Sequence, residues 1–359
     1  MRYLSQAGLT KGMLLARNLF DERCNKNFVD GQKLSNRDIE KIKKAGYPGA
    51  YILDPCTDKI VADPIINEGL YYGTVSSVAQ IMANVRDDST LSYCVPRREQ
   101  LDIVEPVLEA LMEREGARID YLDTRPYAAY EDFHAVMAMI LALRIGMRLG
   151  LTREQLLDLG IASLFHDVGS VFLPGSLLSR PGKLTDEEFE MVKEHVQRGA
   201  EYLERNFALT PSMTQGVLQH HENYDGTGYP NGLRRKKISL FGRIIAICDV
   251  YDALTSKRAF RAAMYPVAAL DVLEQQSDRK FDPDIVDALQ NIVAPYPTAC
   301  LVRLKSGEFG VVAHNYPQDP TKPLLQAYDG KRPQTTFYDL LNDPAFSNAR
   351  IVKFVDELT

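Results

Sequence analysis

Five of the chain's six histidines lie between residues 134 and 221, and one of them directly precedes an aspartate. Imidazole nitrogens and carboxylate oxygens are common ligands of divalent ions, so this gathering favours a metal centre. A single histidine on an apolar helix face is more often a hydrogen-bonded core residue. Seven residues together favour metal binding instead: His134, His166, Asp167, His195, His220, His221 and Asp249.

The positions of the adjacent pairs bear on the number of ions. Neighbouring residues on a helix point about 100° apart. Each of the pairs His166–Asp167 and His220–His221 can therefore serve one wide site but hardly one tight tetrahedral ion. This favours two ions, with the Asp167 carboxylate as the bridge. Two ions a few ångströms apart can stabilise both the attacking and the leaving oxygens of a displacement at phosphorus.

The elements that carry these residues are expected to be helices. From residue 128 to residue 294 the apolar spacing is helical, and helix-start signals recur. These signals are Thr152 with Gln155, Thr185 with Glu188, and Thr210 before Pro211. The sequence therefore predicts an all-helical core domain over residues 126–294.

The flanking regions have a different texture, and the chain as a whole is expected to be mainly α. Residues 1–60 predict a small α+β module, with one helix that begins after Ser35 and ends near Gly46. Residues 61–125 predict a connecting region with two helices. Residues 295–359 predict a β-rich extension that begins with a hairpin at Ser306 and Gly307 and gains a strand near residues 350–355.

Composition excludes several classes of protein. The 359 residues include 42 Lys and Arg against 48 Asp and Glu, a net charge of −6, which argues against a general surface for nucleic acid polymers. The five cysteines are widely spaced with no C-x-x-C pair, so they are expected to be reduced thiols. No signal peptide and no long apolar run is evident, which predicts a cytoplasmic protein without a membrane span.

The ordered motifs resemble those of the HD-GYP domains, a branch of the HD phosphohydrolases. The resemblance is strong from about residue 130 to residue 290 and weaker outside. It rests on LFHDVG at 164–169, PGKLT at 181–185, KEH at 193–195, HHENYDGTGYP at 220–230 and DVYDALTS at 249–256.

This resemblance implies a phosphodiesterase that opens cyclic di-GMP to pGpG and can proceed to GMP, with Asp167 as a catalytic residue. It implies two divalent ions, with iron or manganese the expected metals because the ligands are nitrogen and oxygen without thiolate. One ion would be held by His134, His166, Asp167 and Asp249. The other would be held by Asp167, His195, His220 and His221.

The resemblance also implies substrate and partner contacts. Arg258, Arg261 and Asp252 would bind the dinucleotide, although basic residues at a helix end are often simply solvated. The loop of Gly228, Tyr229 and Pro230 would lie near the site and would contact partners such as diguanylate cyclases with GGDEF domains. The sequence leaves open whether the chain forms a homodimer.

Two positions depart from the family pattern. Ser170 stands where the family has a lysine that would donate to a substrate phosphate. Tyr130 stands where members with a third metal have a glutamate, which favours two ions and a packing role for Tyr130. Ser170 motivates one alternative, a receptor that binds cyclic di-GMP without useful turnover. Because other HD enzymes act on varied phosphoesters, an enzyme for another cyclic nucleotide or dinucleotide is a further alternative.

Overall fold

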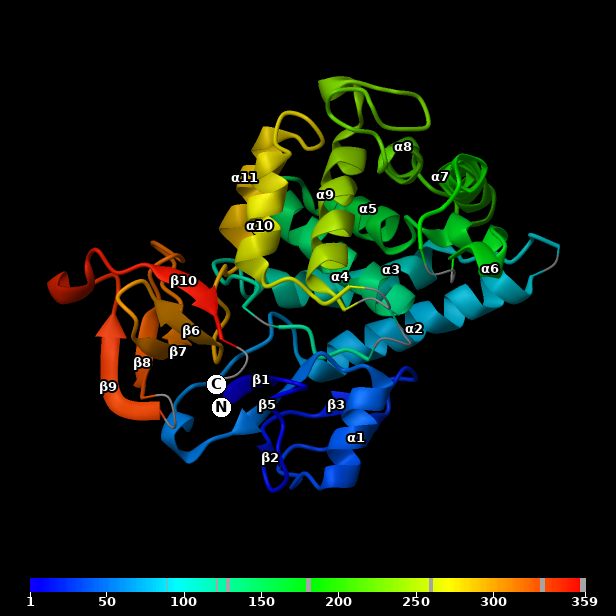
Figure 1. The fold of residues 1–359 in the computed structure, drawn as a ribbon. Helices are drawn as coiled ribbons and strands as arrows, with labels where there is room; N and C mark the ends of the chain where they lie inside the picture. Colours follow the sequence, from blue (N-terminus) through cyan, green and yellow to red (C-terminus); the bar gives the residue numbers. More distant parts are fainter. Residues whose placement is uncertain are drawn as a thin grey trace.

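The computed structural model describes residues 1–88, 90–120, 122–126, 130–178, 182–257, 261–329 and 333–355. The chain folds into a small α+β module, a large helical body and a C-terminal β-sheet (Figure 1). The expectation of a mainly α protein with these two flanking parts is confirmed.

The N-terminal module is built on short antiparallel strands. Its three-stranded sheet has the order β1-β5-β2, with β1 at Arg2–Ser5, β5 at Gly49–Leu53 and β2 at Leu14–Leu15. A second pair joins β3 (Leu19–Phe20) to β4 (Lys26–Phe28). Helix α1 (Asn36–Ala45) begins with a capping box between Ser35 and Asp38 and ends at Gly46, whose φ is 78°. This is the predicted helix, with its predicted ends.

The helical body is organised around α4 (Tyr130–Arg148). Residues on every face of α4 are buried, as expected for a helix that is apolar all round, and it packs against α2, α5 and α9. The helices of the body are α2 (Glu68–Asp87), α3 (Arg97–Met112), α4, α5 (Arg153–Leu164), α6 (Gly175–Leu178), α7 (Asp186–Asn206), α8 (Pro211–Gln219), α9 (Leu240–Thr255), α10 (Pro266–Gln275) and α11 (Pro283–Ile292). The capping boxes predicted at Thr152 and Thr185 begin α5 and α7.

Helices α2 and α3 are part of this body rather than a separate link. Val78 of α2 and Val104 of α3 are fully buried in the same apolar cluster as Leu141 of α4 and Ile245 of α9. The two predicted helices of the connecting region are therefore present, and their side chains complete the main core. The core therefore continues across the boundary predicted between residues 125 and 126, and the domain boundaries as a set stay a prediction.

The C-terminal sheet has five antiparallel strands in the order β10-β6-β7-β8-β9. The strands are β6 (Leu301–Leu304), β7 (Phe309–His314), β8 (Leu324–Tyr328), β9 (Pro333–Asp339) and β10 (Ile351–Phe354), so the predicted hairpin and final strand are both observed. The sheet packs on the N-terminal module, because Tyr51 and Ile60 share an apolar cluster with Leu301 and Val311. Met1 and Val355 both pack against this cluster, so the two ends of the described chain lie near each other.

Across the described ranges, every helix falls short of the length and apolar character needed to span a bilayer. Among the described residues, Cys24, Cys94 and Cys248 are free thiols.

Candidate metal centre

The pair His166–Asp167 lies just beyond the end of a helix. Helix α5 ends at Leu164, and Asp167 precedes the 3-10 helix η3 (Val168–Phe172). Likewise α8 ends at Gln219, so His220 and His221 follow it. The helical angle of 100° therefore does not apply to either pair, so it gives no support for two ions, and the number of ions stays a prediction. His220 and His221 turn toward the same point, with ring centroids 4.1 Å apart.

The ligating atoms form two groups that share Asp167. In one group are Asp167, His195, His220 and His221, and in the other are His134, His166 and Asp167. Within each group the candidate ligand atoms all lie within 4.8 Å of one another. Asp249 adjoins the second group, with its Oδ1 atom 3.3 Å from His134 Nε2. The structure thus brings together all seven residues singled out in the sequence.

Three of the histidines are oriented by backbone carbonyls. His166, His195 and His220 each donate from Nδ1 to the carbonyl three residues earlier, over 2.7, 2.6 and 2.6 Å. Because a carbonyl only accepts, the proton must sit on Nδ1 and the lone pair on Nε2. These Nε2 atoms are buried and make no hydrogen bond within the part of the chain that the structure describes.

The distances around Asp167 fit atoms that share an ion. Asp167 Oδ1 lies 3.3 Å from His195 Nε2 and 3.5 Å from His220 Nε2, and Oδ2 lies 3.5 Å from His166 Nε2. Hydrogen-bonded N and O atoms are usually about 2.7–3.2 Å apart. Two ligands at about 2.1 Å from one ion are roughly 3.0–3.4 Å apart. Buried imidazoles with unbonded lone pairs at these distances therefore fit divalent ions on both sides of Asp167.

His134 is held differently, by side chains. Its Nδ1 atom lies 2.8 Å from Asp252 Oδ2, and the Tyr130 hydroxyl approaches the same nitrogen at 3.2 Å. Asp252 is 1% exposed, and its other oxygen accepts from Arg125 Nη2 at 3.0 Å. These contacts indicate that Asp252 supports His134 with one oxygen and binds Arg125 with the other, and its predicted contact with substrate stays a prediction.

Two glycines allow Asp167 to approach His195. A methyl group on Gly169 of η3 would lie 1.9 Å from the His195 carbonyl oxygen, and one on Gly199 of α7 would lie 2.9 Å from Gly169 N. Both contacts are with backbone, so a side chain at either position would push η3 away from α7. The glycine of the HDVG motif is therefore required by packing.

Burial and charge together set the protonation of the centre. Burial lowers the pKa of His166 and holds the pKa of His221 well below its usual range, so both are neutral. Burial opposes protonation of His195, but the Asp167 carboxylate outweighs it and raises the pKa. Burial also opposes ionisation of Asp167, yet its histidine neighbours, led by His166, hold its pKa well below the usual range. Asp167 is therefore an anion. Its side chain is 45% exposed, so the carboxylate is only partly buried.

His134 and Asp249 form a charged pair without metal. Burial would lower the pKa of His134, but hydrogen bonds to Asp249 and Asp252 raise it to about 10. The pKa of Asp249 is lowered, because His134 outweighs the effect of burial. An ion that binds His134 Nε2 must therefore displace a proton.

A cavity lies beside His220 and His221. It is lined in part by Tyr229, Lys193 and Lys280. The Tyr229 ring lies 4.9 Å from the His221 ring, and Lys193 Nζ lies 5.7 Å from the centroid of Tyr229. The predicted loop of Gly228, Tyr229 and Pro230 is therefore beside the centre. Gly228 is required there, because an added methyl would lie 2.2 Å from Asn223 N.

Of the remaining predicted positions, Arg261 and Ser170 are not members of the two ligand groups. Arg258 lies outside the described residues. The Arg261 Nη2 atom donates to the Ala253 carbonyl near the end of α9. Ser170 is partly buried in η3 and donates its backbone N–H to Asp167 O at 2.9 Å.

Sequence reasoning missed the role of Arg125. Its guanidinium is 9% exposed and bonds Asp123, Asp252 and the Phe133 carbonyl. No periodic pattern surrounds Arg125, so only its tertiary contacts reveal it. Lys280 was also missed, since it follows a helix far from the motifs in sequence.

Comparisons with known proteins agree with this geometry. A family model for the HD domain matches residues 106–285. Cyclic di-GMP phosphodiesterase PA4108 of Pseudomonas aeruginosa is 31% identical over 245 residues, which cover 68% of this chain and 59% of that protein. The response regulator RpfG of Xanthomonas campestris, a cyclic di-GMP phosphodiesterase, is 38% identical over 181 residues, covering 50% and 46%.

A 3'3'-cGAMP-specific phosphodiesterase 2 of Vibrio cholerae is 35% identical over 157 residues, covering 44% of this chain and 30% of that protein. The chain thus spans between about a third and three fifths of the length of these three relatives. The family model covers half of the chain, including every residue of the two candidate groups, and the chain belongs to the HD domain family.

Proposed function

We propose that this chain is a metal-dependent phosphodiesterase that opens cyclic di-GMP to pGpG and can proceed to GMP. The observation that carries the proposal is the position of Asp167 between two groups of histidines whose buried Nε2 atoms lack hydrogen bonds among the described residues. Two of the relatives are named for cyclic di-GMP hydrolysis, which supports this choice of substrate.

The proposed centre holds two ions, with iron or manganese expected. His134, His166, Asp167 and Asp249 would hold one, and Asp167, His195, His220 and His221 would hold the other. Bound divalent ions would supply charge stabilisation at the phosphoryl oxygens and activation of water. The chain's own part is to fix the imidazoles through their Nδ1 bonds and to keep their Nε2 lone pairs available.

The substrate is expected to enter the cavity beside His221. Lys193 and Lys280 line this cavity, and their ammonium groups suit the two phosphates of a cyclic dinucleotide. Tyr229 offers a ring on which a guanine base can stack. Arg258 and Arg261 remain proposed substrate contacts. The loop that carries Tyr229 also remains the proposed contact for diguanylate cyclases with GGDEF domains, and a homodimer remains untested.

A direct test is an anaerobic assay of manganese- or iron-loaded protein with cyclic di-GMP. The proposal expects pGpG to form and expects Lys193→Gln to raise KM more than it lowers kcat. Lys44→Gln, which changes an exposed lysine of α1 outside the cavity lining, is the matched control and should behave as wild type. Absence of product from fully loaded protein would contradict the proposal.

The second candidate is a cyclic di-GMP receptor with little turnover, and Ser170 favours it. A serine cannot supply the charge of the family's lysine, and hydrogen bonds to charged groups contribute about 1.5–3 kcal/mol. Ser170→Lys should therefore raise kcat by about tenfold or more if the chain is an enzyme with a weakened site. Binding by calorimetry with no product from either protein would favour the receptor.

The third candidate keeps the chemistry and changes the substrate. The similarity to a 3'3'-cGAMP-specific phosphodiesterase motivates it. Competition between cyclic di-GMP and 3'3'-cGAMP in one assay would rank the two substrates, and faster consumption of 3'3'-cGAMP would replace the first proposal with this one.

A further inference from the structure

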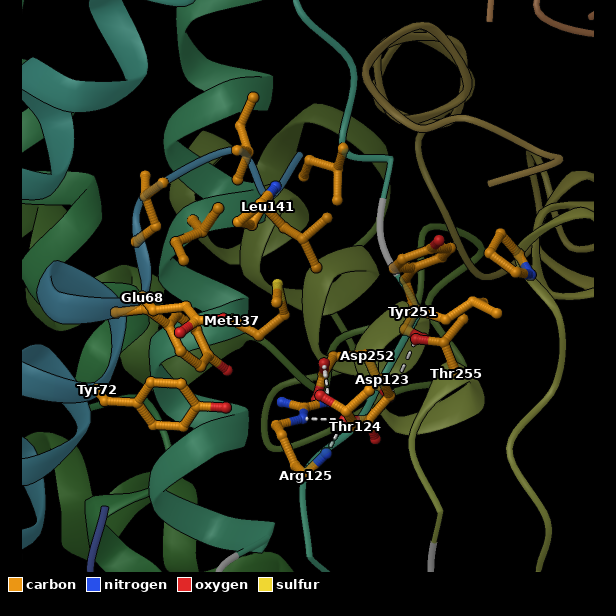
Figure 2. Close-up of a pocket in the computed structure, with 18 of the residues that line it drawn as sticks. Glu68, Tyr72, Asp123, Thr124, Arg125, Met137, Leu141, Tyr251, Asp252 and Thr255 are labelled. Atoms are coloured by element: carbon orange, nitrogen blue, oxygen red, sulfur yellow. Dashed lines mark hydrogen bonds and ion pairs between the residues drawn. The ribbon is translucent and has the colours of Figure 1, made fainter. Parts of the chain in front are cut away.

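A second cavity lies where the segment before α2 meets α4 and α9. Its walls come from parts of the chain far apart in sequence, including Ile66, Tyr72, Met137, Leu141 and Tyr251. Figure 2 shows Tyr72, Met137 and Leu141 facing the cavity, with Arg125, Asp123 and Asp252 joined by ion pairs along one side. The cavity is therefore mainly apolar, with a polar wall.

The charged groups on its walls are paired with one another. Arg17 lies 3.6 Å from Glu68, and Arg125 lies 2.7 Å from Asp123 and 3.0 Å from Asp252. Asp252, the third carboxylate of the lining, is also paired with His134 Nδ1 at 2.8 Å. A charged ligand would therefore lose its hydration on entry and would meet only groups that already have a partner of opposite sign. The cavity is accordingly suited to an uncharged, predominantly apolar molecule, which also suits its tyrosine and aliphatic lining.

The polar wall is continuous with the candidate metal centre. Asp252 lines the cavity and its Oδ2 atom lies 2.8 Å from His134 Nδ1. Arg125 also lines the cavity, bonds the other oxygen of Asp252, and donates to the Phe133 carbonyl at 3.2 Å. A molecule that shifts Arg125 or Asp252 would therefore change the orientation of the His134 ring.

The geometry points to a regulatory pocket: an uncharged, predominantly apolar small molecule binds between α2, α4 and α9 and alters metal binding through Arg125, Asp252 and His134. Binding in the pocket stands independently, whereas its effect on metal rests on the proposed function. Arg125 acts here as a positioning residue, because it reaches the centre through Asp252. Coupling between two sites typically changes an affinity by about 5–150-fold.

Binding is tested by calorimetry with the full chain and two uncharged probes, indole and 1-octanol. Each has a matched anion, indole-3-acetate or octanoate. We expect at least one uncharged probe to bind, with its anion at least about tenfold weaker because the charge must be desolvated. Ile66→Phe places a larger side chain in the cavity and should weaken binding of the probe by at least tenfold. Val61→Phe adds the same ring at a nearby position that is 61% exposed, and should leave binding unchanged.

Failure of both uncharged probes to bind, or equal binding to wild type and Ile66→Phe, would overturn the pocket. Circular dichroism of each variant checks that it is folded.

The coupling is tested by the affinity for Mn²⁺, measured by competition with a chelator with and without the probe. We expect about a fivefold or larger change in wild type and little change in Arg125→Lys, which keeps the charge but loses the paired donors. An unchanged Mn²⁺ affinity in wild type saturated with probe would overturn the coupling while leaving the pocket standing. Absence of Mn²⁺ binding would instead refute the proposed function, and probe binding would still report on the pocket.

Discussion

The candidate metal centre orients its histidines in two ways, and the contrast separates local from long-range control. His195 is held by a carbonyl three residues earlier in the middle of α7, and His220 by a carbonyl three residues earlier in α8. His134 is held by Asp252, 118 residues away, which is bound in turn by Arg125. His166 belongs to the same ligand group as His134, but its ring is held by the carbonyl of Ser163, three residues earlier. Changes far from the centre should therefore act first through His134.

The largest effect is expected where the two groups meet, at Asp167. Asp167→Ala should weaken the binding of both ions by more than about 100-fold. Loss of a residue that only orients a metal ligand already lowers metal affinity by about 10–100-fold. Hydrolysis should be lost with the metal. Metal quantification and a product assay on the same sample measure both, and full turnover by this variant would refute the shared role.

Asp252→Asn should separate the two groups. The amide keeps the shape of the side chain but loses the charge that faces His134 and Arg125. The affinity for the ion at His134 should therefore fall by about 10–100-fold. The ion held by His195, His220 and His221 should keep its affinity. Chelator competition followed at both ions checks this, and equal weakening of the two would show that the contrast is wrong.

Gly169→Ala tests the locally built group through packing. The added methyl would lie 1.9 Å from the His195 carbonyl oxygen, and overpacking of this kind costs about 1–3 kcal/mol of the free energy of unfolding. Urea denaturation with and without Mn²⁺ measures the loss. Gly175→Ala is the matched control, because a methyl there meets nothing within 4 Å. Similar destabilisation by both substitutions would contradict the close approach of η3 and α7.

Tyr130→Phe should have the smallest effect. It removes one hydroxyl, 3.2 Å from His134 Nδ1, while the Asp252 contact at 2.8 Å remains. The Mn²⁺ affinity should fall by less than about 1.5 kcal/mol, the upper range of a single neutral hydrogen bond. A loss as large as that of Asp252→Asn would mean that Tyr130 is a principal support of His134.

Local signals in the sequence predicted much of the architecture. Ser35 with Asp38, Thr152 with Gln155, and the Ser306–Gly307 turn act over a few residues, so their structural consequences could be predicted without the fold. The residue types of the metal groups could also be recognised, because clustered histidines are uncommon outside such sites. Their assembly around Asp167 agrees with the proposed bridge.

The errors concern features that tertiary structure decides. The helical angle assigned to His166–Asp167 failed because α5 ends two residues before His166. The resemblance implies a substrate contact for Asp252, whereas its bond to Arg125, 127 positions away, could be found only in the folded chain. The cavity beside Tyr72 likewise depends on segments that meet only in the folded chain.

The central claim is that Asp167 joins two ion sites, and anomalous diffraction from manganese-loaded crystals tests it most directly. The account predicts two manganese peaks, each bonded by one oxygen of Asp167, with His134 beside one and His221 beside the other. A single peak, or two peaks of which either lacks Asp167 as a ligand, would contradict it.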